Sequence, residues 1–210
     1  MDSYKEKSKS YYNKTAKNYS NTSDGEFVKP MYEEIINRII SKNPKKILDL
    51  GCGTGYVLSE VKKIYKLKNK DLDMYGLDIS EEMIKIANEN LKGEANLKVG
   101  DSEYIPWEDN SFDLVVCNAS FHHYPNPKKT LLEIKRVLNS NGTLILGDPT
   151  APIIVREIFN LFIKYSNSGD YRVYNQNEIE ELFKSTGFIP KNFKLLKRNK
   201  FFINGEVSKD

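Results

Sequence analysis

Short apolar runs alternate with amphipathic stretches over the middle of the chain. The runs have the length and apolar content of strands buried on both faces, and they predict strands at residues 46–50, 74–78, 95–99, 112–118 and 143–147. Between them the apolar residues take helical spacing, as after Ser80, where Met83, Ala87 and Leu91 form one stripe. Repeated strand–helix–strand units of this kind predict a parallel sheet.

The chain upstream of the first strand predicts one long helix. Apolar residues recur about every four positions from Phe27 to Ile40, and Asn43 and Pro44 end the pattern. This helix is expected to lie against the sheet. The polar segment before it, which contains several tyrosines, predicts either a frayed tail or a short helix that folds over a ligand.

Two helices are expected on either side of the fifth strand. The first spans about 127–138 and stops at Asn141-Gly142, because this pair is typical of a helix end. The second spans 153–165 and carries apolar residues on most of its faces. Such a helix is either buried or covers another part of the molecule.

The last part of the chain predicts an antiparallel pair of strands. A helix at 177–185 precedes two β-like runs, at 193–196 and 201–207, with no crossover helix between these runs. The complete pattern predicts an α/β fold: a doubly wound, mostly parallel, seven-stranded sheet with an antiparallel edge strand and helices on both faces.

Composition fits a soluble chain with an ordinary core. The 210 residues are 39% hydrophobic and 29% charged, and the formal net charge of +3 is too small to recruit nucleic acid by itself. No run reaches the roughly 18 apolar residues of a membrane span, and the N-terminus lacks a signal-peptide core. We expect a cytoplasmic protein with no nucleic acid or membrane partner. Cys52 and Cys117 have no ligand at metal-site spacing, so no metal is expected.

A glycine-rich turn follows the first predicted strand. In ILDLGCGTG, Gly51, Gly53 and Gly55 lead from strand to helix, which lets the backbone approach a ligand and points helix N–H groups toward it. A phosphate loop needs Lys and Ser/Thr after its last glycine, and a dinucleotide fingerprint needs glycine where Tyr56 stands. The preceding Asp49 would repel a pyrophosphate, but it suits a ligand that carries an ammonium group.

The stretch ILDLGCGTG resembles motif I of the class I S-adenosylmethionine-dependent methyltransferases. The methionine end of that cofactor is a zwitterion, which suits a turn that offers an acid and free backbone donors. The resemblance spans about Tyr11 to the end of the chain and is strongest from Ile47 to Asp148. It implies a Rossmann-like fold, S-adenosyl-L-methionine as the cofactor and S-adenosyl-L-homocysteine as the product.

Three further stretches stand in the family's order, each at the carboxyl end of a predicted strand, where ligands of open α/β sheets collect. In MYGLDIS, Asp78 can accept from both ribose hydroxyls, and the resemblance places Ile79 beside the adenine. In VGDSEYIP, Asp101 resembles the acid that binds the adenine amino group, with Ser102 beside it. In FDLVVCNASFHHY, the main chain of Asn118 is implied to line the cofactor near its sulfur.

The resemblance therefore implies one cofactor site. Tyr19 joins it because it resembles a family tyrosine that closes over the methionine end. The expected cofactor-binding residues are Tyr19, Asp49, Gly51, Cys52, Gly53, Gly55, Asp78, Ile79, Asp101, Ser102 and Asn118.

Methyl transfer from a sulfonium needs the acceptor atom in line, about 3–3.5 Å from the methyl carbon. A hydroxyl or amine acceptor also needs a base, and the only histidines, His122 and His123, are the candidate catalytic residues. The stretch FHHYPNP resembles one shared by members with different substrates, which favours a wall of the site or a helix entry instead. Tyr124 and Trp107 either line the same mouth or pack in the core.

Acceptor choice in this family usually lies in an N-terminal cap and in an insert after the fifth strand. Here these correspond to a helical cap at 1–43 and to a helical insert at about 149–174 within a methyltransferase domain at 44–210. Both are rich in aromatic and aliphatic residues, so we expect a partly apolar small-molecule acceptor, with helix 153–165 as its roof or as a dimer contact. The chain is expected to be a monomer or homodimer.

Two other functions stay open at this point. One is a nicotinamide-dinucleotide oxidoreductase of the same fold class, against which the missing third glycine and Asp49 argue. The other is a non-catalytic module that binds S-adenosylmethionine.

Overall fold

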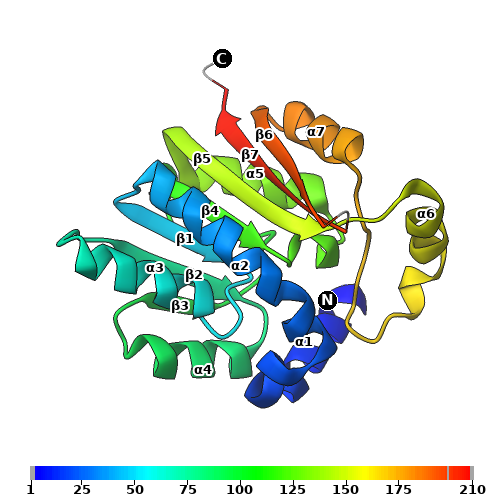
Figure 1. Ribbon diagram of the computed structural model, residues 1–210, viewed down its shortest axis with the longest axis horizontal. Coiled ribbons are helices and arrows are strands. Elements are labelled where there is room, and N and C mark those ends of the chain that lie inside the picture. Colours follow the sequence, from blue (N-terminus) through cyan, green and yellow to red (C-terminus); the bar gives the residue numbers. More distant parts are fainter. Residues whose placement is uncertain (1–2, 198, 209–210) are drawn as a thin grey trace.

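The protein, described by a computed structural model over residues 3–197 and 199–208, is built around one seven-stranded sheet with helices on both faces (Figure 1). The strands are β1 (Lys46–Leu50), β2 (Asp73–Asp78), β3 (Asn96–Val99), β4 (Phe112–Asn118), β5 (Leu138–Pro149), β6 (Phe188–Leu196) and β7 (Lys200–Val207). The α-helices are α1 (Ser3–Thr15), α2 (Ser23–Lys42), α3 (Tyr56–Leu67), α4 (Glu81–Leu91), α5 (Pro127–Val137), α6 (Ile153–Phe162) and α7 (Gln176–Ser185). Short 3₁₀ helices are η1 (Ala16–Asn21), η2 (Phe121–His123) and η3 (Ile163–Tyr165).

The strand order is β3-β2-β1-β4-β5-β7-β6. Strand β1 pairs in parallel with β2 on one side and with β4 on the other, so the order reverses beside β1 and the loops at its carboxyl end diverge. Strand β7 is antiparallel to both of its neighbours and lies one place in from the edge, between β5 and β6. The predicted doubly wound, mostly parallel sheet with antiparallel pairing at one edge is confirmed.

Two apolar clusters fill the space between the sheet and the helices. On one face α2 and α3 pack against the central strands, with the fully buried residues Met31, Ile35, Ile39, Leu58, Val61, Ile47, Val116 and Ile145. On the other face α5 and α7 do the same, with Leu131, Ile134, Val137, Ile179, Phe183, Leu48, Val115 and Leu144. Helix α2 therefore lies against the sheet, as its four-residue spacing predicts.

Helix α5 ends at Val137, within one residue of the predicted end near Leu138. The next strand, however, starts at Leu138, before the predicted stop at Asn141-Gly142. Leu138 is already extended, is buried, and pairs with Phe112 of β4 across a register shift. Strand pairing and burial of this leucine outweigh the local helical pattern, and β5 therefore begins well before Thr143.

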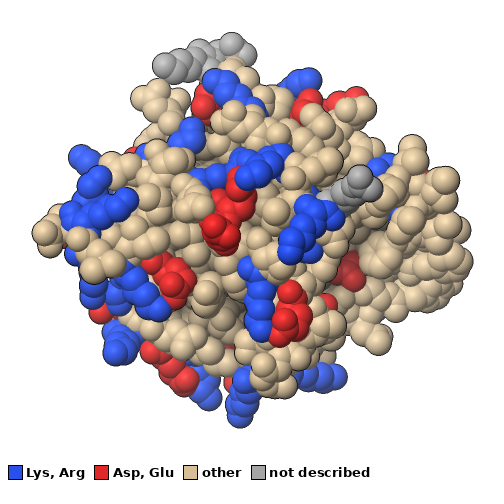
Figure 2. Space-filling model, in the orientation of Figure 1, with Lys and Arg blue, Asp and Glu red and all other residues tan. Residues whose placement is uncertain are grey.

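Helix α6 stands away from the sheet, with most of its apolar side chains exposed. Its buried residue is instead Arg156, which pairs with Glu157 and faces Glu178 of α7, while Asn160 bonds the backbone of Val173. The helix is thus attached through its polar side, which explains why its apolar side faces outward. The lobe that it forms in Figure 2 is mostly uncharged on the face shown. None of the described helices, α6 included, is long and apolar enough to cross a bilayer.

The polar N-terminal segment forms a helix, the second of its two expected states. Asn13 of α1 bonds Ser80 and Glu81 at the start of α4. Ser8 bonds the backbone at Ser168 and Lys7 bonds that at Lys164, so α1 is also tied to the segment that follows α6. Helix α1 therefore connects two parts of the chain that lie beyond the sheet's carboxyl edge.

Because Ile35 of α2 is fully buried against the sheet, we expect Ile35→Ala to lower the free energy of unfolding by about 2–5 kcal/mol. The neighbouring Asn37 is exposed, and Asn37→Ala should change it by less than about 0.5 kcal/mol. Urea unfolding followed by circular dichroism measures both. Equal, small effects would show that α2 is not part of the core.

Candidate active site

A cavity lies at the carboxyl ends of β1, β2 and β4, where the strand order reverses. Counted together with the open solvent at its mouth, its empty space is about 1000 Å³. The N-terminal elements cover it, since Tyr12 of α1, Tyr19 of η1 and Tyr32 of α2 all belong to its wall.

The glycine turn after β1 forms one wall of this cavity. Gly51 has φ +76°, and a Cβ there would lie 2.5 Å from the side chain of Ser120. Gly53 has φ +52°, and a Cβ there would meet no atom within 4 Å, so its backbone borders open space. Gly55 is not part of the cavity wall; it begins α3, and a Cβ there would lie 3.0 Å from Leu91 of α4. Gly55 therefore serves the close packing of the turn on α4.

Two carboxylates lie side by side in the cavity, at the ends of the paired strands β1 and β2. Asp49 is almost fully buried, and burial, together with the charge of Asp78, raises the pKa of Asp49 to about 7. Burial also raises the pKa of Asp78, although the N–H groups of Ser80 and Gly53, each 2.9 Å away, oppose that shift. The pair is therefore a costly arrangement unless a cation or hydrogen-bond donors come between the two carboxylates.

The end of β3 is occupied by a side chain from the N-terminal helix. Lys5 of α1 lies 2.8 Å from Asp101 and 2.6 Å from Glu103, and all three are in or beside the wall. Burial would lower the pKa of Lys5, but these two carboxylates outweigh it and raise the pKa. Ser102 lies next to Asp101 in the cavity wall and is near Thr130, with 3.3 Å between the hydroxyl oxygens.

The remaining residues predicted for the cofactor site also belong to the cavity wall. These are Tyr19, Cys52, Ile79 and Asn118. The side-chain oxygen of Asn118 is buried without a hydrogen-bond partner within the described chain. The structure thus brings together every predicted cofactor residue except Gly55.

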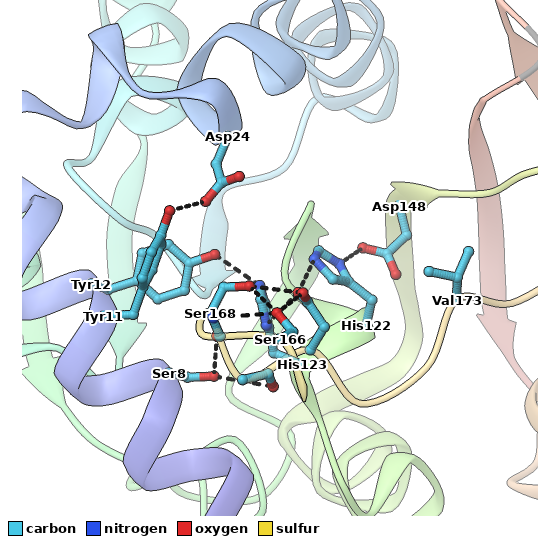
Figure 3. A network of polar contacts seen from close by, with 12 residues as sticks. Ser8, Tyr11, Tyr12, Asp24, His122, His123, Asp148, Ser166, Ser168 and Val173 are labelled. Atoms are coloured by element: carbon cyan, nitrogen blue, oxygen red, sulfur yellow. Dashed lines mark hydrogen bonds and ion pairs between the residues drawn. The ribbon is translucent and has the colours of Figure 1, made fainter. Parts of the chain in front are cut away.

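The two histidines face different surroundings (Figure 3). His123 belongs to the cavity wall, and its Nε2 lies 2.8 Å from the hydroxyl of Tyr12. His122 is not in the wall; its Nδ1 donates to Asp148 at the end of β5, at 2.9 Å. Asp170, from the segment after α6, lies between both rings.

Burial and nearby charges shift the pKa values of the two histidines in opposite directions. Burial, together with the neighbouring His122, lowers the pKa of His123. Burial would also lower the pKa of His122, but the carboxylates of Asp148 and Asp170 outweigh it and raise that pKa. Burial raises the pKa of Asp148, whereas the two imidazoles outweigh burial at Asp170 and lower its pKa.

Several site residues are not found from the sequence. Of these, Asp148 could most easily have been identified from its sequence position, because it lies at the end of the fifth strand, at the same edge of the sheet as the predicted acids. Lys5 and Asp170 carry no signal in the sequence, since they reach the site through contacts between distant segments. Of the two aromatic candidates, Tyr124 belongs to the cavity wall, whereas Trp107 packs against Tyr75 in the core.

No residue of the expected insert, 149–174, belongs to the described cavity wall. The prediction that helix 153–165 forms the roof is therefore wrong for this cavity. The physical reason is the polar attachment of α6 described above, which holds the helix to one side. The cover comes from the N-terminal elements instead.

Comparisons with known proteins agree with this geometry. A protein-family profile described as a methyltransferase domain matches residues 41–189. The demethylmenaquinone methyltransferase of Thermotoga maritima is 29% identical over 177 residues, which are 74% of this chain and 75% of that protein. The ubiquinone/menaquinone biosynthesis C-methyltransferase UbiE of Wigglesworthia glossinidia brevipalpis is 30% identical over 143 residues, which are 64% of this chain and 56% of that protein.

Solved structures share the fold. The YcgJ protein of Bacillus subtilis has a TM-score of 0.69 at 16% identity, covering 85% of this chain and 100% of that one. An S-adenosylmethionine-dependent methyltransferase of Aquifex aeolicus has a TM-score of 0.62 at 21% identity, covering 78% and 82%. With the family profile matched over most of its length, the chain belongs to the class I S-adenosylmethionine-dependent methyltransferases, of the small-molecule type.

Proposed function

We propose that this chain transfers a methyl group from S-adenosylmethionine to an apolar aromatic small molecule, with a quinol-type ring as the favoured acceptor. One observation carries the proposal: the open turn at Gly53, the buried carboxylate of Asp49 and the half-buried carboxylate of Asp78 share one cavity. When bound, the cofactor supplies an electrophilic methyl group on a sulfonium. Everything else in the reaction is binding, orientation and proton removal by residues of this chain.

The cavity wall fits the parts of this cofactor. Asp49 can accept from its ammonium group, which would relieve the repulsion between the two carboxylates. Asp78, whose oxygens are already oriented by the N–H groups of Gly53 and Ser80, can accept from the ribose hydroxyls. Asp101 can accept from the adenine amino group in place of Lys5. We assign the other cofactor residues from their place in the wall, except Gly55.

The acceptor assignment rests on the aromatic lining and on the relatives. The cavity wall includes the rings of Tyr12, Tyr19, Tyr32, Tyr56 and Tyr124, which suit a flat apolar ligand. Two similar proteins are named for demethylmenaquinone and for ubiquinone and menaquinone biosynthesis. We propose that the N-terminal cap supplies most of the acceptor contacts.

His123 is the histidine that we place at the acceptor end. Its Nε2 lies 2.8 Å from Tyr12, whose side chain also faces the cavity, whereas His122 is turned toward Asp148. We propose that His123 acts on the acceptor through the Tyr12 hydroxyl, which can bond an acceptor oxygen. Methylation of a ring carbon would form one C–C bond and break the S–CH₃ bond, with S-adenosylhomocysteine as the leaving group, and the proton of that ring carbon would pass to solvent.

Turnover with reduced naphthoquinones that carry short side chains tests the proposal. We expect release of S-adenosylhomocysteine and a product heavier by one methyl group, detected by mass spectrometry. Tyr12→Phe should lower kcat at least tenfold, or about 1.4 kcal/mol, because it removes the hydroxyl that faces the cavity.

Tyr11→Phe is the matched control, because the Tyr11 hydroxyl bonds Asp24 and is not in the cavity wall. It should leave kcat within about twofold. Binding of S-adenosylhomocysteine without turnover on quinols or on a broad acceptor panel would contradict the proposal and favour a non-catalytic module. Retention of a nicotinamide dinucleotide in its place would favour the oxidoreductase.

Cofactor binding should also depend on pH through Asp49. Its pKa is raised to about 7 in the unliganded protein, and an ammonium group beside it would lower that pKa. Binding therefore favours the ionised carboxylate and weakens as the pH falls below 7. We expect the Kd for S-adenosylhomocysteine, measured by isothermal titration calorimetry, to be about tenfold higher at pH 6 than at pH 8.

Asp49→Asn removes the titrating group. The Kd of this variant for S-adenosylhomocysteine should therefore be higher than that of the parent protein and nearly constant over this pH range. The same slope in Asp49→Asn and in the parent protein would show that Asp49 does not face the ammonium group.

A further inference from the structure

Two imidazole nitrogens and one carboxylate oxygen lie close together beside the cavity. No hydrogen bond of normal length joins them. One ligand atom from each of His122, His123 and Asp170 lies within 4.8 Å of the other two. Asp170 Oδ1 is 3.5 Å from His122 Nε2 and 3.2 Å from His123 Nδ1. His123 Nδ1 is buried and has no hydrogen-bond partner among the described residues. Figure 3 shows the two rings turned toward the same point.

The two separations that involve the carboxylate oxygen are close to the edges of a metal coordination shell. Around a four-coordinate ion with ligands at about 2.0–2.1 Å, neighbouring ligand atoms lie about 3.3 Å apart. A charge-assisted hydrogen bond between a ring nitrogen and a carboxylate would be shorter, at about 2.7–2.9 Å. The distances of 3.2 and 3.5 Å are close to the first value.

Each of the three side chains is oriented through an atom that does not face the centre. His122 is held by Asp148, which accepts from Nδ1 and so leaves the Nε2 lone pair free. The Tyr12 hydroxyl contacts His123 at Nε2, so that Nδ1 is the ring nitrogen that faces the centre. Asp170 is held at Oδ2 by the hydroxyls of Ser166 and Ser168, which leaves Oδ1. Outer contacts of this kind orient the ligands in protein metal sites.

The negative charges around the centre also favour a bound cation. Asp148 and Asp170 bring two carboxylates into a largely buried region, and Asp148 Oδ2 is buried without a partner in the described chain. Over residues 3–197 and 199–208, no lysine or arginine pairs with either of them. Protonation of His122 would supply one positive charge, whereas a divalent ion would balance both carboxylates.

We propose that His122, His123 and Asp170 bind a divalent transition-metal ion of the Zn²⁺ class. Two imidazoles and one carboxylate suit Zn²⁺, Co²⁺ or Ni²⁺ better than Mg²⁺ or Ca²⁺, which prefer all-oxygen shells. The sequence gives no sign of this site, because Asp170 comes from a segment far along the chain from the histidines. The proposal therefore departs from the expectation of no metal.

The ion would fix the position of His123 and, with it, of Tyr12. With Nδ1 on the metal, the imidazole carries its proton on Nε2 and donates it to the Tyr12 oxygen. The O–H of Tyr12 is then free to point into the cavity. This second consequence rests on the proposed function, whereas the metal site itself does not.

Equilibrium dialysis of the EDTA-treated full chain against ZnCl₂, followed by elemental analysis, tests the site without any methyl donor. We expect one ion per chain, and with CoCl₂ the intense visible absorption of four-coordinate Co²⁺. Asp170→Asn should weaken binding at least tenfold, because it removes an anionic ligand. Asp71→Asn, at an exposed acid outside the site, should leave it unchanged.

His123→Gln gives an independent measure if Asp170→Asn fails to fold by circular dichroism, and it should show the same loss. Retention of well under one ion per chain, or equal affinity in the ligand variants and in Asp71→Asn, would overturn the proposal and leave a proton on His122 in the ion's place. Neither outcome changes what the quinol turnover assay reports, so failure of the site and failure of the proposed function are distinguishable.

Discussion

The repulsion between a buried carboxylate and a half-buried one is the constraint on which the rest of the site depends. Asp49 and Asp78 end the paired strands β1 and β2, and the parallel register brings those ends to the same edge of the sheet. Burial of both acids is unfavourable, as the pKa of about 7 at Asp49 shows. The turn at Gly53 offsets part of that cost with one N–H to Asp78, and a ligand with an ammonium group and hydroxyls would offset the rest. A ligand of this kind would therefore stabilise the two carboxylates in this arrangement.

The two helices that cover the cavity are held in different ways. Helix α2 belongs to the sandwich through Ile35 and its neighbours, whereas α1 is tied by Lys5 to Asp101, by Tyr12 to His123 and by Ser8 to the segment after α6. Such contacts exchange more readily than buried apolar surface, which suits an element that must admit a cofactor and an acceptor. The Lys5–Asp101 pair lies where we propose that the adenine binds, and on that proposal cofactor binding and the position of α1 are coupled.

The sequence predicts the sheet and the cofactor wall well because both follow from local patterns. Apolar runs place the strands, and acids such as Asp78 and Asp101 mark their carboxyl ends. Gly55 lies outside the cavity wall and packs close to Leu91, and the sequence does not distinguish a glycine of this kind from one that faces a cofactor. The outward α6 and the cluster around Asp170 depend on contacts between distant segments, for which a single sequence holds no signal.

The most direct test of the account compares two acids at opposite ends of β2. Asp78 stands at the carboxyl end, in the cavity, and Asp73 at the exposed amino end of the same strand. Calorimetric titration with S-adenosylhomocysteine should give a Kd at least tenfold weaker for Asp78→Asn, about 1.4 kcal/mol, and an unchanged Kd for Asp73→Asn. An unchanged Kd in both variants, with the fold intact, would contradict the claim that the paired carboxylates bind the cofactor.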